Sequence, residues 1–173
     1  MQVTLRPARP IDQSFLQAVY ASTRVEEMTL VDWPSEQKTA FLQMQFNAQA
    51  EHYRAYYPSA TYQIILRDDL PMGRLIVNRS PHEILLMDIA LLPEYRNTGI
   101  GTGLIRELQD ESMRSGRALH LHVEIFNPAL RLYQRLGFRS IGESGIYLEM
   151  EWNGPAQRTS RPFLNDGQDS ASA

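Results

Sequence analysis

The stretch over residues 85–103, LLMDIALLPEYRNTGIGTG, constrains the fold of this chain more than any other. Its apolar run at 85–92 is typical of a buried strand, and Pro93 ends that run. Three closely spaced glycines then lead into an amphipathic helical pattern over 104–115. A strand, a glycine loop with free N–H groups and a helix N-terminus together form an anion site. The stretch therefore predicts that the chain binds a phosphate-bearing cofactor.

The spacing of this loop excludes two common phosphate-binding motifs. A dinucleotide-binding loop places its first glycine directly after the strand and reads G-x-G-x-x-G, whereas four residues intervene here and the glycines fall as G-x-G-x-G. A P-loop requires Gly-Lys-Ser/Thr, and the chain's single lysine is Lys38. The pattern that fits is Arg-x-x-Gly-x-Gly, formed by Arg96, Gly99 and Gly101.

Composition narrows the function classes. The 173 residues suit one domain, which we place at 1–152, and the polar segment 153–173 is expected to be a flexible C-terminal tail. The net charge of −3, with scattered arginines, argues against a nucleic-acid partner. No apolar run is long enough to span a membrane, and the N-terminus lacks a signal-peptide pattern, so a cytoplasmic location is the expectation. The absence of cysteine excludes thiolate metal sites and a cysteine nucleophile.

Hydrophobic periodicity predicts a chain that alternates between strands and helices. The segment 85–125 reads as a βαβ unit with parallel strands, whereas 61–92 reads as an antiparallel meander. We therefore predict an α/β (α+β) fold with a mixed, mostly antiparallel twisted sheet of about seven strands and helices on both faces. The expected strands cover 3–6, 61–66, 72–78, 85–92, 119–125, 138–141 and 146–152, and the expected helices cover 11–21, 25–30, 34–57, 104–115 and 129–136.

A second segment, NPALRLYQRLGF at 127–138, completes a recognisable pair. Together with the Arg-x-x-Gly-x-Gly loop, it resembles the GNAT superfamily of N-acetyltransferases, and the order of elements extends the likeness to about 1–152. The resemblance implies acetyl-CoA, or another short acyl-CoA, as co-substrate. It also implies a small-molecule or peptide amine as acceptor, no metal cofactor, and a monomer or homodimer.

The resemblance assigns roles to two sets of residues. In this superfamily the strand matching 85–92 splays from the strand matching 119–125, and the pantetheine arm of acetyl-CoA lies between them. Tyr133 is then the general acid that protonates the leaving thiolate. The implied cofactor-binding residues are Ile89, Ala90, Leu91, Arg96, Asn97, Thr98, Gly99, Ile100, Gly101, Thr102, Asn127 and Tyr133.

Several of these residues have a simpler structural alternative. Gly99 and Gly101 let phosphate oxygens approach the backbone because they lack Cβ, but they could also serve a plain tight turn. Arg96 offers a planar guanidinium to a phosphate. Tyr133 could be an ordinary core tyrosine with a satisfied hydroxyl, and Asn127 could be a simple helix N-cap.

The general base is the least determined part of the site. An alkylamine with a pKa of about 10.4 is neutral in roughly one molecule in 10³ at pH 7, so it needs more help than an α-amine. The candidates are Asp88, Glu124 and His122, and Asp88 is notable because a carboxylate inside an apolar strand needs a reason. His120, His122 and Glu124 share one strand face, but no third metal ligand is evident, so no metal is expected. A water chain could replace a side-chain base.

The acceptor site is expected between the early helices and the end of the sheet. Aromatic side chains could line it, although ordinary helix packing explains the same pattern: Trp33, His52, Tyr53, Tyr56 and Tyr57. The absence of an obvious base leaves a second function open, a catalytically reduced acyl-CoA-binding regulatory or interaction module. A role on charged tRNA or a ribosomal protein is a third, which the net charge disfavours.

Overall fold

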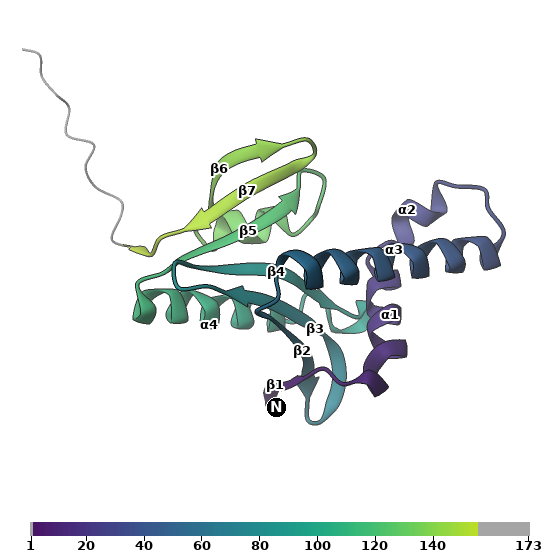
Figure 1. Cartoon of the computed structure of the whole chain (residues 1–173), viewed down its shortest axis with the longest axis horizontal. Helices are drawn as coiled ribbons and strands as arrows, with labels where there is room; N and C mark the ends of the chain where they lie inside the picture. The colour runs from purple at the N-terminus through teal and green to yellow at the C-terminus, as the bar shows by residue number, and fades with distance from the viewer. Residues whose placement is uncertain (1, 156–173) are drawn as a thin grey trace, which may run out of the picture.

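The computed structural model describes residues 2–155, which form one open seven-stranded sheet with helices on both faces, as Figure 1 shows. This confirms the predicted fold class. Of the predicted tail 153–173, the residues from 156 onward lie outside the described part of the chain. No described helix has both the length and the apolar character needed to cross a bilayer.

The elements follow the predicted order with small shifts at their ends. The strands are β1 (Val3–Pro7), β2 (Ala60–Arg67), β3 (Leu70–Arg79), β4 (Glu83–Leu91), β5 (Ala118–Glu124), β6 (Arg139–Ser144) and β7 (Tyr147–Trp152). The helices are α1 (Gln13–Ser22), α2 (Val25–Thr29), α3 (Ser35–Tyr56), α4 (Ile100–Ser115) and α5 (Leu130–Arg135), with short 3-10 turns η1 (Pro10–Asp12) and η2 (Pro93–Tyr95).

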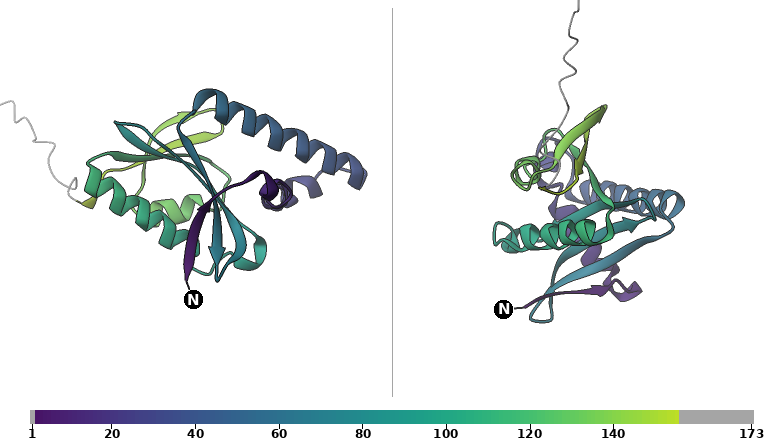
Figure 2. Two further views of the ribbon diagram at one scale, coloured as in Figure 1. Left: turned by 60° about the horizontal axis from the view of Figure 1, so that its bottom comes forward. Right: turned by 90° about the vertical axis from the view of Figure 1, so that its left-hand side faces the viewer.

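The sheet runs in the order β1-β2-β3-β4-β5-β7-β6. Only β4 and β5 pair in parallel, and every other neighbouring pair is antiparallel. The strands twist strongly along the sheet in Figure 2. The single parallel pair is the predicted βαβ unit, in which α4 makes the crossover, and it marks the centre of the sheet.

One face of the sheet packs on α4, where Ile105, Leu108 and Leu104 meet the apolar face of β3, β4 and β5. Ile105 is fully buried, and burying a side chain of that size contributes roughly 1.5–3 kcal/mol. The opposite face is covered by α1 and α3, which contribute Tyr20 and Phe46. The alternating apolar residues of the central strands therefore face α4, and the other face is the more polar one.

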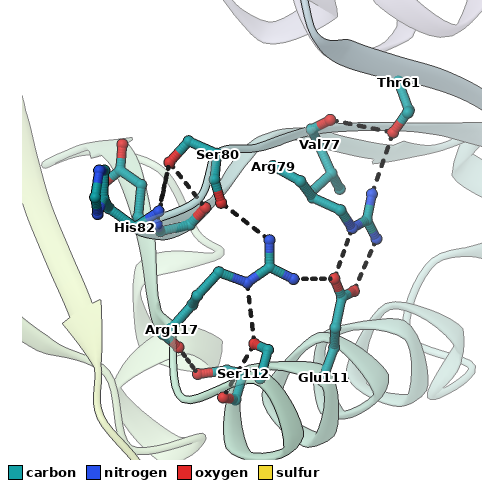
Figure 3. Close-up of polar contacts among 10 residues, drawn as sticks. Thr61, Val77, Arg79, Ser80, His82, Glu111, Ser112 and Arg117 are labelled. Carbon is teal, nitrogen blue, oxygen red and sulfur yellow. Dashed lines mark hydrogen bonds and ion pairs between the residues drawn. The ribbon is translucent and has the colours of Figure 1, made fainter.

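An ionic network fixes the C-terminal half of α4 to the sheet (Figure 3). Glu111 accepts hydrogen bonds from Nε and Nη2 of Arg79 at 2.7 and 2.9 Å, and from Nη2 of Arg117 at 3.2 Å. Arg117 also donates to the Ser80 carbonyl at 3.0 Å. The hydrogen bond from Arg79 lowers the pKa of the Glu111 carboxyl, against the opposing effect of burial. Because this end of α4 is held, its N-terminus has a fixed place beside the end of β4.

Two of the shifted boundaries bear on the site. Helix α4 begins at Ile100 rather than Leu104, because Gly99 takes a left-handed conformation (φ +83°) as N-cap and Gly101 is helical. Strand β5 ends at Glu124, so Ile125 is not part of its apolar face but half exposed in the following turn, where its N–H bonds to Ile146. A glycine inside a helix costs about 1 kcal/mol, so Gly101 is not there for helix stability.

Candidate functional site

The central strands separate where the site begins. The parallel pairing of β4 and β5 runs from Glu83 and Ala118 to Leu86 and Leu121, and no pairs follow. Strand β4 continues for five more residues and β5 for three. The edges of two strands at the centre of the sheet are thus left unpaired, which provides backbone groups for an extended ligand.

The backbone of β4 beyond this point is oriented by its pairing with β3. The Leu92 N–H donates to the Met72 carbonyl at 2.8 Å, on the β3 side. Since backbone groups alternate along a strand, those of Ala90 also face β3, whereas those of Ile89 and Leu91 face the opening toward β5. Of the three predicted cofactor-binding residues on β4, Ile89 and Leu91 therefore present their backbone to the open side.

A β-bulge explains how a carboxylate comes to lie in an apolar strand. Ile76 of β3 pairs with Asp88, but Val77 pairs with Leu86, so Met87 is an extra residue on β4. The bulge reverses the alternation: Leu86 before it and Ile89 after it both pack toward the α4 core. Asp88 is turned to the opposite face, and a bulge also bends its strand. The bulge lies next to the last parallel pair, where β4 and β5 part.

Asp88 is held on that face by a buried arginine. Arg74 of β3 is only 4% exposed, and its Nε donates to Asp88 Oδ2 at 2.5 Å. Its Nη2 donates to the Gln49 side chain at 3.0 Å, and its guanidinium lies 5.6 and 5.9 Å from the ring centres of Tyr20 and Phe46. The sequence analysis did not identify Arg74. The signal that could have found it is the one that identified Asp88, a charged residue in the middle of an apolar strand.

Tyr133 lies in α5, and its ring belongs to the core cluster on the α4 side of the sheet. It is 8% exposed and packs edge-on against Phe138, with ring centres 5.8 Å apart. Burial, and then the charge of Asp88, raise the pKa of Tyr133 to about 12. Within residues 2–155 its hydroxyl has no hydrogen-bond partner, and at neutral pH it is protonated. Tyr133 therefore brings an available proton donor close enough to Asp88 to feel its charge.

The glycine loop presents backbone donors next to the end of β4. The first intrahelical bond of α4 runs from Gly103 N–H to Gly99 O at 2.9 Å, and the preceding N–H groups, 97–102, have no partner in the described part of the chain. Asn97, like Gly99, has a left-handed backbone (φ +58°). A Cβ placed on Gly99 or Gly101 would meet no protein atom within 4 Å. The loop can therefore hold an anion at a helix N-terminus.

Arg96 directs its side chain away from this loop. Its Nε donates to the Leu91 carbonyl at 2.9 Å, and its Nη2 donates to the carbonyl and the hydroxyl of Ser22, at 3.1 and 3.0 Å. Asn127 is also engaged, since its side-chain oxygen accepts from the Ala129 N–H at 2.9 Å in the turn before α5, whose N-cap is Ala129. The Thr98 hydroxyl likewise donates to the Tyr95 carbonyl at 2.6 Å, so three of the predicted cofactor-binding side chains bond to the protein itself.

Glu124, the second predicted carboxylate, lies at the end of β5 in a polar cluster. Arg24, which begins α2, ion-pairs with Glu27 at 2.9 Å and lies 3.6 Å from Glu124. The Tyr147 hydroxyl donates to Glu124 at 3.3 Å. Sequence analysis identified neither Arg24 nor Tyr147, because nothing in the local sequence links Glu124 to residues 100 positions before it or 23 positions after it.

The two strand histidines lie apart from these carboxylates. His120 bonds to Glu83 at 2.6 Å and to Glu151 at 3.0 Å, and His122 is exposed. Burial alone would lower the pKa of His120, but its two carboxylate partners outweigh burial and raise it. Within residues 2–155 no group of three potential metal ligands is found.

Of the aromatic residues predicted to line the acceptor site, Tyr53 of α3 contacts β4 at the bulge. Its hydroxyl lies 3.5 Å from the carbonyl oxygen of the bulged Met87, and burial, followed by the charge of Asp88, raises its pKa. His52 and Tyr56 are exposed and stack on each other, with ring centres 4.6 Å apart. The wall opposite Tyr133 is thus formed by Tyr53, Asp88 and the residues that hold them.

Comparisons with known proteins find a matching family. Residues 23–138 match the acetyltransferase (GNAT) family. A mouse thialysine N-epsilon-acetyltransferase is 34% identical over 77 residues, which are 43% of this chain and 45% of that protein, so the chain spans less than half of that relative.

Solved structures share the fold. PaiA N-acetyltransferase from Thermoplasma acidophilum, in complex with coenzyme A, matches with a TM-score of 0.67 and 17% identity over 89% of this chain and 100% of that one. A GNAT family acetyltransferase from Elizabethkingia anophelis, with acetyl-CoA bound, matches with a TM-score of 0.56 and 17% identity over 87% and 97%.

Proposed function

Because the chain belongs to the acetyltransferase (GNAT) family, we propose that it moves an acetyl group from acetyl-CoA to an amine by direct attack. The observation that carries this proposal is the opening between β4 and β5, with a protonated tyrosine on one side and a carboxylate on the other. The mouse relative is named for an ε-amine, which supports an alkylamine of a small molecule or peptide as acceptor.

The acetyl-CoA would lie along the unpaired edge of β4. Its pantetheine amides pair with the backbone of Ile89 and Leu91, as an added strand would. Its diphosphate accepts hydrogen bonds from N–H groups of 97–102, where the α4 dipole adds about 0.3–1 kcal/mol. The side-chain amide nitrogen of Asn127, in the turn before α5, would contact the pantetheine arm from the other side.

The chemistry then needs two proton transfers. The amine nitrogen attacks the thioester carbonyl carbon, and the resulting oxyanion accepts a hydrogen bond from the Leu91 N–H. As the carbon–sulfur bond breaks, Tyr133 protonates the thiolate. Asp88 receives the amine proton through Oδ1, since Oδ2 is bonded to Arg74. We call the side of the opening formed by Tyr53, Asp88 and the Glu124–Arg24 pair the acceptor wall. Within it, the charge of Glu124 attracts a cationic amine.

A second function has one specific observation in its favour. Both carboxylates near the opening are ion-paired, Asp88 with Arg74 and Glu124 with Arg24. In both places a guanidinium competes with a substrate amine for the carboxylate. A module that binds acyl-CoA without turning it over would tolerate this arrangement, so binding and turnover must be measured separately.

The test is thiol release from acetyl-CoA across lysine, peptide N-termini, polyamines and arylamines. Tyr133→Phe should lower kcat about 10–100-fold, because an acid assists a leaving group that departs fairly easily. Tyr62→Phe is the matched control, since the Tyr62 hydroxyl is buried without a partner in the described chain. Binding of coenzyme A without turnover of any amine would favour the second function, and no binding would refute both.

A further inference from the structure

Arg96 forms hydrogen bonds to both β4 and α1, which lie beside the proposed acetyl-CoA site and the proposed acceptor site. Leu91, whose carbonyl accepts from Arg96 Nε, is the last residue of β4. Ser22, whose carbonyl and hydroxyl accept from Arg96 Nη2, is the last residue of α1. The guanidinium therefore links β4, along which acetyl-CoA would lie, to α1, whose C-terminal end leads to Arg24 of the acceptor wall.

The contact with α1 is well suited to a cation. The last carbonyls of a helix lack intrahelical partners and carry the negative end of its dipole. The Ser22 hydroxyl donates to the Val19 carbonyl at 2.7 Å, so its oxygen is oriented to accept from Arg96. Arg96 thereby caps the C-terminus of α1 from a position 74 residues further along the chain.

The end of α1 sets the position of Arg24. Thr23 and Arg24 continue directly from Ser22, and their N–H groups bond back to carbonyls of Tyr20 and Ala21. The Arg24 guanidinium lies 5.5 Å from the Tyr20 ring centre and 3.6 Å from Glu124. A shift of the α1 end would therefore move the cation that faces Glu124 across the acceptor wall.

The contact with β4 acts on the acetyl-CoA side. The Leu91 carbonyl faces the open side of β4 and belongs to the same peptide as the Leu92 N–H, which bonds to Met72 of β3. Its hydrogen bond to Arg96 holds this peptide from the open side as well. The adjoining Leu91 N–H is the group assigned above to the oxyanion.

We propose that Arg96 is a positioning residue that joins the β4 end to the acceptor wall, and that it is not a ligand of the diphosphate. This inference rests on the acetyltransferase function proposed above. It differs from the expectation drawn from the Arg-x-x-Gly-x-Gly pattern alone, in which the guanidinium binds phosphate. On this account the loop amides bind the diphosphate, and Arg96 sets the geometry in which the bound thioester meets the amine.

The experiment compares Arg96→Met with Arg106→Met, which removes the same charge from an exposed site on α4. Calorimetry measures the Kd of coenzyme A and of pantetheine, and steady-state kinetics measure the KM of the acceptor amine. Arg96→Met should raise the acceptor KM about five- to tenfold and change the Kd of coenzyme A by less than about twofold. Arg106→Met should change neither.

A phosphate-binding Arg96 gives a different pattern. Arg96→Met would then weaken coenzyme A about tenfold or more while leaving pantetheine binding unchanged, and that result overturns the proposal. Ser22→Ala provides a second test through a double-mutant cycle. It should raise the acceptor KM in the wild-type background and have little further effect with Arg96→Met, whereas additive effects would contradict the link.

Amide hydrogen exchange tests the role of Arg96 independently of the proposed catalytic function. Arg96→Met and Ser22→Ala should each speed amide exchange over residues 13–29, with or without turnover. If the wild type shows no turnover but this exchange effect is present, the link stands and the catalytic proposal fails. Unchanged exchange in both variants would refute the link itself.

Discussion

Replacing Arg74 by methionine tests the buried ion pair beside the opening. Arg74 is 4% exposed and the Asp88 side chain 23%, so methionine would leave a largely buried carboxylate without its cation and Gln49 without its donor. Breaking a buried pair costs about 3–5 kcal/mol, and the partial exposure of Asp88 reduces this to roughly 2–4 kcal/mol. For a domain of this size the melting temperature should fall by roughly 4–16 °C.

The assay is urea unfolding with calorimetry, and the double variant Arg74→Met with Asp88→Asn is the control. It keeps the methionine but removes the unpaired charge, so it should recover at least half of the lost stability. A loss below about 1 kcal/mol in the single variant would refute the reasoning. So would a double variant no more stable than the single one, because the charge would then not be the cause.

Four further substitutions test three separate parts of the structure. Gly101→Ala should stabilise the unliganded protein by up to about 1 kcal/mol yet weaken coenzyme A binding about tenfold, because its Cβ meets no protein atom but would meet the diphosphate. Gly103→Ala, whose N–H is already bonded to Gly99, should stabilise without that loss, and calorimetry that shows equal binding in both would contradict the loop assignment. Gly73→Ala should cost at least about 2 kcal/mol and reduce turnover, since its Cβ would lie 2.1 Å from the Ala90 carbonyl of β4; chemical denaturation within error of the wild type would contradict the strand packing. Because the pKa of Glu111 is lowered in the folded state, its contribution to stability is full above its unfolded pKa and is lost as pH falls through the folded value. Glu111→Gln should therefore flatten the decline in melting temperature below about pH 5, and an unchanged slope would show that the α4 network does not titrate.

The sequence predicted the elements that depend on local pattern. Alternation and helical spacing located all seven strands and the five helices, and residues 96–99 of the glycine loop lie between β4 and α4 as expected. The start of α4 was placed too late because Gly101 and Gly103 read as loop residues. Their helical conformation depends on Gly99 acting as a left-handed N-cap, which no propensity indicates.

The long-range parts of the site could not be predicted in this way. The bulge at Met87 follows from how β3 and β4 pair, and it alone decides which face Asp88 occupies. Its partner Arg74 and the Arg24–Glu124 contact join positions on different elements. Spacing along the chain carries no information about such pairs, because they depend on the completed packing.

A crystal structure with coenzyme A tests the central claim most directly. The account predicts the diphosphate on the N–H groups of 97–102 and the pantetheine amides paired with Ile89 and Leu91. It also predicts the sulfur about 3–4 Å from the Tyr133 hydroxyl. A coenzyme bound elsewhere, or a sulfur that points away from Tyr133 and out of the opening between β4 and β5, would contradict it.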